Sequence, residues 1–349
     1  MNIYDIAKKA NVSVATVSRV INRNGPVKES TRKKVEKAIA ESHYTPSAIA
    51  RSLSSRQTDN IGVIMPDIFN PFYNHVLNGI TRVAKNYGYN TILFSAEESV
   101  ERLHQILEGL KGQSLKGLIL NPVRDQDDET VHLMRELESM GVPIVLFDRN
   151  ITGINCNGVF SDDFGGAYSA VEHLIRIGHR RIAIFRGPQD IRPGRERFLG
   201  YAKALQDNGI QMEEKLVCDY DFLLNGKVYE QTRKLMKSKN PPTVFFTSNN
   251  FGTLECIKSL LDMGLSIGKD VGLIGFDEIL TLQYVNQAIS VVDREVVRMG
   301  METMSLLQSC FVKEADKELK QKIVIDMHLL LRGSEYCEKV TGADGSNRK

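Results

Sequence analysis

The sequence lacks the features that mark membrane, secreted and metal-binding proteins. No apolar run approaches the ~18 residues of a membrane span, and the opening Met1-Asn2-Ile3-Tyr4-Asp5 lacks the basic and apolar regions of a secretory signal. The five cysteines are scattered and form no Cys-x-x-Cys pair, which favours reduced thiols over a disulfide framework or a zinc site. We therefore expect a cytoplasmic protein without membrane contact, metal or cofactor.

The common enzyme motifs are also missing. There is no G-x-G-x-x-G or P-loop for nucleotide phosphates, no G-x-S-x-G nucleophile turn and no H-E-x-x-H zinc helix. Acidic residues follow several predicted strands, but nothing pairs them with a nucleophile or a metal. The sequence predicts no catalytic residues, and we expect a protein that is not an enzyme.

The charge of the chain is unevenly distributed. Its 349 residues are too many for one ordinary core, so two or three compact units are expected. Residues 1–60 carry 11 Lys and Arg against 5 Asp and Glu, whereas the other 289 residues carry 34 against 38. A basic head on a mildly acidic body favours a polyanionic partner for the head, although a solvated charged face has the same composition.

Apolar spacing in the head predicts three short helices. The first covers residues 3–10 and ends at Asn11. The second starts at Val14 after the N-cap Ser13, and the third is capped by Ser30. The predicted core residues are Val17, Val20, Ile21, Val35, Ala38 and Ile39.

The second helix has a surface suited to the major groove of DNA. Beside its apolar stripe, its residues are small, polar or basic. Arg19 could make a bidentate contact to guanine, and the methyl group of Ala15 could touch thymine. Basic residues of the third helix could face phosphates. The candidate DNA contacts on or before the second helix are Ser13, Ala15, Thr16, Ser18, Arg19 and Asn22.

The segment after the head predicts a helix that is stable only when it is packed. Pro46 is suited to a helix start, and a helix ending near Leu53 is too short to persist alone. Leu53 in a basic segment could be a wedge for the minor groove; a linker whose leucine packs on the body is the alternative. The candidate DNA contacts here are Ser47, Ala50, Arg51 and Leu53.

The body alternates between strand-length apolar runs and helical segments. One series runs from Ile61 to Phe147 and a second from Gly158 to Phe276. This pattern predicts two doubly wound α/β lobes with parallel sheets, which bind ligands beyond the carboxyl ends of their strands.

Polar residues follow these strands, among them Asp148, Asp162 and Asn249. Together with nearby Phe and Tyr they suit sugar recognition, although any single Asp or Asn after a strand is more often a helix cap or turn residue. Arg195 and Arg197 open a helix beside these ends, where they could be solvated or could anchor a carboxylate or phosphate.

Three stretches of the first 53 residues resemble the head and hinge of the lactose-repressor family, closest to its catabolite-control, sugar-responsive branch. They are residues 2–7, 12–22 and 47–53. The resemblance places Val14, Ala15 and Arg19 where the family reads bases, and Leu53 where its hinge leucines enter the minor groove.

The body is similar to the family's effector-binding core, which resembles periplasmic sugar-binding proteins. The similar stretches are residues 69–73, 173–182, 195–201, 264–277 and 332–334. The resemblance implies a DNA-binding repressor controlled by a small carbohydrate. It implies effector contacts at Phe72, Tyr73, Asp148, Arg197, Asn249 and Asp277, to which the strand-end and helix-start patterns add Asp162 and Arg195.

The chain departs from the family's usual pattern at two places. Asn249-Asn250 stands where many members have Asn-Asp, and Arg294-Glu295 where many have Gln-Pro. If Arg294 points into the cleft with Arg195 and Arg197, the effector is expected to be a sugar acid or sugar phosphate. In the catabolite-control branch, a phosphorylated carrier protein docks near the helix that follows Arg294-Glu295, at a site containing a tyrosine. The equivalent place in this chain is about Val297, which weakens the case for a phosphocarrier partner.

The expected architecture is an all-α helix-turn-helix head (1–45), a hinge (46–59) and a two-lobed periplasmic-binding-protein-like α/β core (60–334). The N-lobe is expected over about 60–157 and 290–318, and the C-lobe over about 158–289 and 319–334. Residues 335–349 are polar and are expected to be disordered.

We expect a homodimer, because the tail has no leucine heptad and a two-fold operator suits two heads. Effector binding would change the spacing of the hinges and so the affinity for pseudo-palindromic DNA. The alternatives are a sugar-binding protein without a regulatory role and a global catabolite regulator with a phosphocarrier corepressor.

Overall fold

The computed structural model describes residues 2–22, 25–42, 58–312 and 320–341. The chain divides into a small unit, Met1–Thr58, and a large one, Asp59–Lys349. Most of the predicted hinge, including Ser47, Ala50, Arg51 and Leu53, lies outside the described residues, as does the side chain of Asn22.

The small unit contains three helices: α1 (Ile3–Ala10), α2 (Val14–Asn22) and α3 (Glu29–Glu41). Asn11 ends α1 in the left-handed conformation, with φ of 52°. Ser13 caps α2 as predicted, since its Oγ accepts a hydrogen bond from the amide of Thr16 at 3.2 Å. The prediction for α3 was wrong in detail: Ser30 is the second residue of the helix, and Lys28 is its N-cap. The core is formed by Ile6, Ala7, Ala10, Val17, Val20, Val35 and Ala38.

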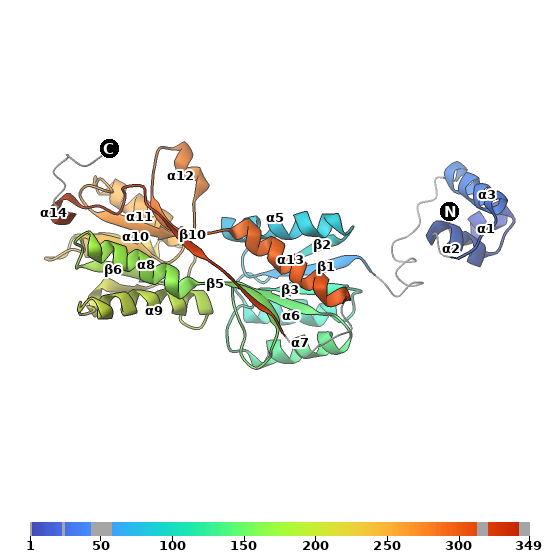
Figure 1. Cartoon of the computed structure of the whole chain (residues 1–349), viewed down its shortest axis with the longest axis horizontal. Coiled ribbons are helices and arrows are strands. Elements are labelled where there is room, and N and C mark those ends of the chain that lie inside the picture. Colours follow the sequence, from blue (N-terminus) through green and yellow to red (C-terminus); the bar gives the residue numbers. More distant parts are fainter. Residues whose placement is uncertain (1, 23–24, 43–57, 313–319, 342–349) are drawn as a thin grey trace. The chain divides into compact units, whose positions relative to one another are not determined.

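The large unit is built on two six-stranded sheets (Figure 1). The first sheet, which defines the N-lobe, is entirely parallel and has the order β11-β5-β4-β3-β1-β2. Its strands are β1 (Asn60–Met65), β2 (Asn90–Ser95), β3 (Gly117–Leu120), β4 (Ile144–Phe147), β5 (Asn157–Ser161) and β11 (Lys322–Ile325). Helices α6 (Val100–Leu110) and α7 (Asp128–Ser139) contribute to the core on one face, and α5 (Pro71–Asn86) and α13 (Val296–Val312) to the core on the other.

The second sheet defines the C-lobe and has the order β12-β10-β9-β8-β6-β7. Its strands are β6 (Ile182–Arg186), β7 (Val217–Asp219), β8 (Val244–Thr247), β9 (Gly272–Phe276), β10 (Ser290–Arg294) and β12 (Met327–Leu330), of which β12 alone is antiparallel to its neighbour. Helices α8 (Asp163–Arg176) and α9 (Arg192–Asp207) pack with one core, and α10 (Lys227–Met236) and α11 (Asn250–Asp262) with the other. Shorter helices are α12 (Leu280–Tyr284), α14 (Glu338–Thr341) and the 3₁₀ turn η1 (Glu214–Leu216).

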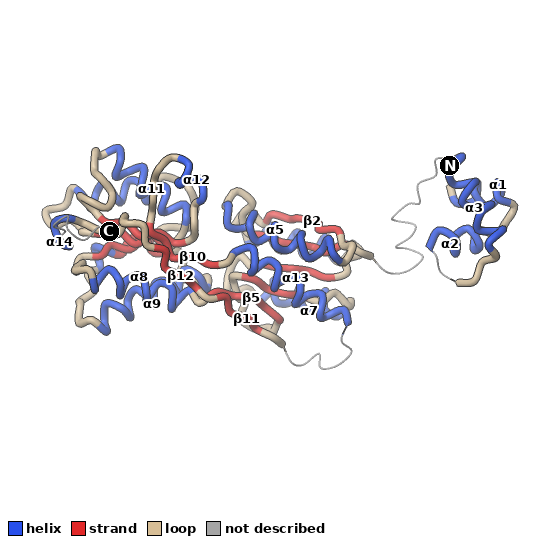
Figure 2. Tube along the Cα trace, turned by 45° about the horizontal axis from the view of Figure 1, so that its top comes forward, coloured by secondary structure: helices blue, strands red, loops and turns tan. Residues whose placement is uncertain are grey.

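The chain crosses between the lobes after β5, after β10 and between β11 and β12 (Figure 2). Three strands therefore lie in the other lobe from the one predicted. Strand β5 pairs with β4 and β11 in the N-lobe, and β10 pairs with β9 in the C-lobe. The apolar pattern identifies a buried strand but carries no signal for which sheet edge accepts it.

Helices α5 and α13 pack with their backbones in close contact. A Cβ atom added at Gly79 would lie 2.1 Å from the carbonyl oxygen of Val297, and one added at Gly300 would lie 2.0 Å from that of Val76. Glycine is therefore required at both positions, because no side chain fits between the two helices.

The expectation of disorder from residue 335 onward was wrong for residues 335–341. Glu335 and Cys337 are buried. The carboxylate of Glu335 accepts the amide of Gly333 at 2.9 Å, and the amide of Glu338 donates to the carbonyl of Lys269 at 2.8 Å. Residues 342–349 lie outside the described part of the chain. Among the helices that are described, none is long and apolar enough to cross a membrane.

Candidate functional site

A cavity lies between the two lobes, at the carboxyl ends of their parallel strands. The space within it that the centre of a water-sized sphere can occupy is about 30 Å³. The N-lobe lines it with Asp67, Asn70, Phe72, Tyr73, Glu98, Asp148 and Arg149; the C-lobe contributes Pro193, Arg197, Phe222, Asn249, Asp277 and Arg294. We call this cavity the cleft.

Two asparagines of the cleft are also helix caps. Asn70 accepts the amide of Phe72 at 3.0 Å at the start of α5, and Asn249 accepts the amide of Gly252 at 2.8 Å at the start of α11. The Oδ1 of Asn70 also accepts Nδ2 of Asn250 at 2.8 Å, which joins the two lobes. Asn70 and Asn249 therefore each cap a helix and line the cleft at the same time.

Equivalent aspartates follow strand β4 in the N-lobe and β9 in the C-lobe. Asp148 and Asp277 both adopt left-handed backbone conformations, with φ of 58° and 67°. Such a conformation is uncommon for residues other than glycine and tends to occur where a side chain must be aimed. The carboxylates of both residues converge on Arg294.

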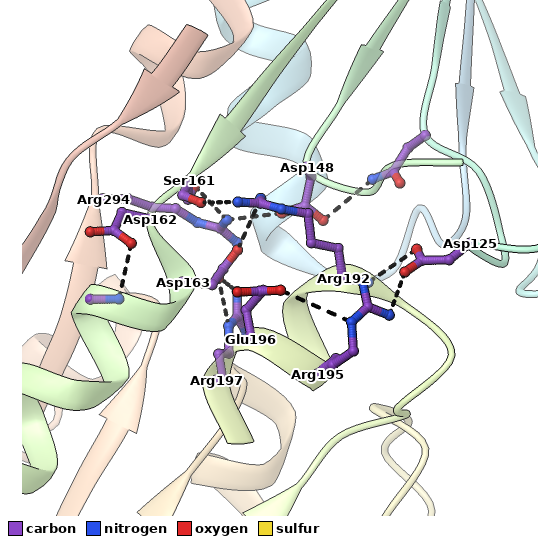
Figure 3. A network of polar contacts seen from close by, with 12 residues as sticks. Asp125, Asp148, Ser161, Asp162, Asp163, Arg192, Arg195, Glu196, Arg197 and Arg294 are labelled. Carbon is purple, nitrogen blue, oxygen red and sulfur yellow. Dashed lines mark hydrogen bonds and ion pairs between the residues drawn. The ribbon is translucent and has the colours of Figure 1, made fainter. Parts of the chain in front are cut away.

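Arg294 lies at the end of β10 and is almost completely buried. Its Nη1 donates to Oδ1 of Asp148 and to Oγ of Ser161, each at 2.8 Å (Figure 3). Its Nε donates to Oδ1 of Asp277 at 3.0 Å. The guanidinium carbon is 4.1 Å from the ring centre of Phe72, within the range of a cation–π contact. Arg294 therefore contacts carboxylates of both lobes.

Burial and neighbouring charges shift the pKa values of Asp148 and Arg294 in opposite directions. Burial alone would raise the pKa of Asp148, but the charges of Arg294, Arg197 and Arg149 lower it below its ordinary value. Burial alone would lower the pKa of Arg294, but Asp277 and Asp148 raise it. Both partners are therefore ionised at neutral pH.

Arg197 is held within the C-lobe. Its Nε and Nη2 are each 2.8 Å from Oδ1 of Asp163 (Figure 3). Its Nη1 donates to the carbonyl of Ser248 at 2.6 Å. Its guanidinium carbon lies 3.6 Å from the ring centre of Phe276. The side chain is thereby fixed at the wall of the cleft.

Arg149 forms a bidentate pair with Glu98 in the N-lobe, at 2.6 and 2.8 Å. It also donates to the hydroxyl of Tyr73 at 3.3 Å. Burial raises the pKa of Tyr73 well above its ordinary value, so the phenol is neutral. Each of the three cleft arginines thus already has a carboxylate partner.

The structure brings together seven of the nine residues predicted to contact the effector. The other two, Asp162 and Arg195, do not line the cleft. Asp162 is exposed and caps α8 through the amide of Gly165 at 2.9 Å. Arg195 pairs with Asp125 at 2.6 Å across the lobe boundary (Figure 3).

The sequence analysis missed several residues of the cleft. Asp163, next to the predicted Asp162, is fully buried and holds Arg197. Glu98 and Phe222 line the cleft without having been singled out, and Asn70 was included only in the similar stretch 69–73. Burial distinguishes Asp163 from Asp162, and no feature of the two-residue pattern indicates which of them faces the core.

The candidate DNA-contacting side of α2 is accessible. Ser13, Ala15 and Arg19 are exposed, Val14, Thr16 and Ser18 are half-buried, and Val17 and Val20 are buried. The apolar side of the helix therefore packs into the small unit, and the small and basic residues face outward.

His179 is held by hydrogen bonds within the C-lobe. No cluster of three or more His, Cys, Asp or Glu side chains in the described ranges is arranged to hold a metal ion. His179 is buried, with Nδ1 2.8 Å from Oγ1 of Thr243 and Nε2 2.9 Å from the carbonyl of Glu335. It joins β6, β8 and the C-terminal segment.

Each of the two units matches a known protein family. Residues 2–47 match the family "Bacterial regulatory proteins, lacI family", and residues 58–330 match "Periplasmic binding proteins and sugar binding domain of LacI family". The chain belongs to the LacI family.

Similar proteins cover nearly the whole of the chain. Catabolite control protein A of Priestia megaterium is 32% identical over 90% of this chain and 93% of its own length. The lac repressor bound to ONPG in the repressed state superposes with a TM-score of 0.81 at 26% identity, and the CelR–cellobiose complex with 0.71 at 28%. Both alignments cover 96% of this chain and 99% of the other.

Membership of the LacI family confirms the predicted resemblance, the fold class and the regulatory function. The chain is a helix-turn-helix transcriptional regulator of a family that responds to sugars and other small molecules, and it is not an enzyme. The match of residues 2–47 excludes a sugar-binding protein without a regulatory role.

Proposed function

We propose that this LacI-family protein is a cytoplasmic, homodimeric repressor that binds a pseudo-palindromic operator through α2 and a neutral sugar in the cleft. The observation that carries the effector class is the pairing of all three cleft arginines with carboxylates. The identity of the sugar and the direction of its effect on DNA affinity are separate questions.

Major-groove contacts are proposed for the outward-facing residues of α2. Arg19 would read guanine, and Ala15, with Val14 beside it, would contact base methyl groups. The other proposed contacts of this helix and its cap are Ser13, Thr16, Ser18 and Asn22. For the hinge we propose Ser47, Ala50 and Arg51 as contacts and Leu53 as the minor-groove wedge.

An anionic effector is less well supported than a neutral sugar. Arg195, on which that hypothesis partly depended, is paired with Asp125 away from the cleft. Four cleft carboxylates (Asp67, Glu98, Asp148 and Asp277) face three guanidinium groups. An added anion would therefore meet no uncompensated positive charge, whereas sugar hydroxyls can both donate to carboxylates and accept from guanidinium groups.

A thermal-shift panel tests this effector class. Neutral pentoses, hexoses and disaccharides are compared with the matching sugar acids and sugar phosphates on the full-length protein. A binding neutral sugar should raise the melting temperature by about 5 °C at ~100 times its Kd. Stabilisation by sugar acids or phosphates alone would refute the proposal.

Selection of bound DNA from a random pool tests the operator role. Two-fold half-sites should be enriched, and the enrichment should change when a stabilising sugar is added. Absence of any enriched sequence, with or without that sugar, would contradict the proposed function.

The homodimer is supported by exposed apolar residues on and beside α12 of the C-lobe (Figure 1). They are Leu280, Tyr284 and Val285. Tyr284 is 88% exposed. Exposed apolar side chains gathered in this way are typical of protein interfaces, and a second copy of the chain is the proposed partner.

A role as a global catabolite regulator is the second candidate. It rests on the similarity to catabolite control protein A. Val297, at the place where that branch is expected to have a tyrosine, offers no hydroxyl to a phosphocarrier protein. We therefore favour control by a sugar alone.

A further inference from the structure

Arg294 lies where the chain leaves the C-lobe for the N-lobe. It is the last residue of β10, and α13, which belongs to the N-lobe, begins at Val296. Only Glu295 separates the two elements. The backbone of Arg294 is therefore fixed by the C-lobe sheet, while its side chain reaches groups of both lobes.

The contacts of Arg294 are divided between the lobes. Asp148 and Ser161 follow or end strands of the N-lobe, whereas Asp277 follows β9 of the C-lobe. Phe72, whose ring it covers, lies in the first turn of α5 of the N-lobe. The guanidinium thus has two partners and a ring in one lobe, and one carboxylate partner in the other.

These contacts exclude solvent almost completely. The side chain of Arg294 is 2% exposed, and those of Asp148 and Asp277 are 5% and 8% exposed. Separating the lobes would leave buried charges without a partner, and in proteins the loss of one member of such a pair is strongly unfavourable. The arrangement therefore favours one spacing of the lobes.

Two other ion pairs between the lobes lie nearer the surface. Arg195 pairs with Asp125 at 2.6 Å, with side chains 39% and 9% exposed. Arg124 pairs with Asp190 at 2.8 Å, with side chains 37% and 57% exposed. Because at least one side chain of each pair is exposed, water screens the attraction, and these pairs can be broken at a smaller cost than the contacts of Arg294.

Arg294 contacts Asp148 and Asp277 in the same way. Arg294 binds Oδ1 of both carboxylates, and Oδ2 of Asp148 is 3.5 Å from Nδ2 of Asn121. Each carboxylate is therefore oriented by Arg294, with its other oxygen not engaged by that residue. A change in the position of Arg294 would move both cleft carboxylates together.

We propose that Arg294 is a positioning residue that sets the spacing of the two lobes. It ties one cleft carboxylate of each lobe to a single buried guanidinium. The width of the cleft, and with it the placement of the groups that face a ligand, depends on this tether. The tether is a property of the protein itself, so it can be tested without an effector or DNA.

The test measures the distance between the lobes in the full-length protein. Spin labels are introduced through non-canonical residues at Glu108 on α6 and Gln206 on α9, both exposed. Distance distributions from pulsed electron resonance are then compared among wild type, Arg294→Gln, Arg294→Lys and Arg195→Gln. Arg195→Gln is the matched control, because it also removes an arginine that bridges the lobes.

We expect one narrow distribution for wild type and for Arg195→Gln. Arg294→Gln should broaden it and shift its mean to longer distances, and Arg294→Lys should restore most of the wild-type shape because it keeps the charge. A distribution for Arg294→Gln that superposes on wild type would overturn the proposal. Equal broadening by Arg195→Gln would overturn it too, because any charge between the lobes would then have the same effect.

A second variant keeps the test decisive if Arg294→Gln does not fold. Asp148→Asn removes the N-lobe carboxylate, which is the partner across the lobe boundary, but leaves the pair of Arg294 with Asp277 in place. It should also broaden the distribution, to a smaller extent than Arg294→Gln. An unchanged distribution for a folded Asp148→Asn protein would contradict the tether.

Discussion

Arg19 illustrates how one exposed side chain on α2 should determine DNA preference. Arg19→Ala should cost roughly 1–3 kcal/mol against the preferred operator and relax the preference at one base pair, because a bidentate contact to guanine is lost. Binding to the selected operator and to its single-base variants is measured at fixed salt.

Lys33→Ala provides the comparison for Arg19→Ala. Lys33 is exposed on α3, where a contact to phosphate would weaken binding to all sequences alike. If Arg19→Ala lowers affinity for every sequence equally, Arg19 is a phosphate contact and not a base reader.

His179 should make the C-lobe sensitive to acid. Burial lowers its pKa from 6.5 to about 4. As the pH falls below 6.5, the unfolded chain takes up a proton that the folded chain excludes, so stability is lost between pH 6.5 and about 4. The full loss is up to about 3 kcal/mol.

The pH dependence of His179 is measured by urea unfolding of the body at a series of pH values. His179→Gln keeps a donor for the carbonyl of Glu335 but does not titrate. The difference in unfolding free energy between wild type and this variant should shrink as the pH falls from 6.5 to about 4. A difference that is constant with pH would contradict the assignment.

The sequence predicted which polar residues stand at the strand ends, but it did not predict which of them are buried. The apolar runs placed Asp148, Asn249 and Asp277 at the cleft because parallel strands share their carboxyl ends. They did not show that Asp163 is buried and Asp162 exposed. The difference depends on how α8 packs on its sheet, which involves residues distant in the sequence.

At the level of elements, the contact between α5 and α13 is the most constrained one. Gly300→Ala should destabilise the body by about 1–3 kcal/mol, because the added methyl group meets the backbone of α5. Chemical denaturation followed by circular dichroism measures the change.

The matched control for Gly300→Ala is Gly109→Ala in α6. Nothing lies within 4 Å of a Cβ added there. Since alanine is a better helix former, Gly109→Ala should be neutral or stabilising by up to about 1 kcal/mol. If both variants destabilise the protein to the same degree, the close approach of the two helices is not the cause.

Caps and apolar spacing predicted where most elements lie. Ser13 before α2 and Asn11 after α1 were found as expected. The partners of β5, β10 and β11 were not predictable, because the apolar pattern of a strand does not specify the sheet edge with which it pairs. The folded segment 335–341, with Glu335 and Cys337 buried, was missed because its apolar residues are too few to show a period.

Leu53→Ala tests the hinge proposed over residues 46–59. Loss of the wedge should weaken specific operator binding and reduce DNA bending while leaving sugar binding unchanged. Gel-based bending assays and thermal shift with the stabilising sugar report the two properties separately. Unchanged operator affinity would refute the wedge role.

At the level of the whole molecule, the exposed apolar surface around α12 should hold two chains together. Tyr284→Glu should shift sedimentation from dimer to monomer, since it places a charge in the proposed interface. Operator affinity should fall with it because two heads no longer bind as a unit.

Leu199→Glu on α9 is the control for this surface. Leu199 is also exposed, at 45%, but lies on another helix. Its variant should remain dimeric. Dissociation of both variants would show that any added negative charge disrupts the assembly, and dissociation of neither would place the interface elsewhere.

The three crossings between the lobes have a consequence for synthesis on the ribosome. The N-lobe sheet gains its edge strand only with residues 322–325, and the C-lobe sheet gains its own only with residues 327–330. Neither lobe can be completed until more than nine tenths of the 349 residues have been translated. The head, whose helices end at Glu41, has all its parts long before. During most of translation a nascent chain therefore presents a completed DNA-binding unit followed by two unfinished sheets, whose open edges are exposed to misassembly until the last strands emerge.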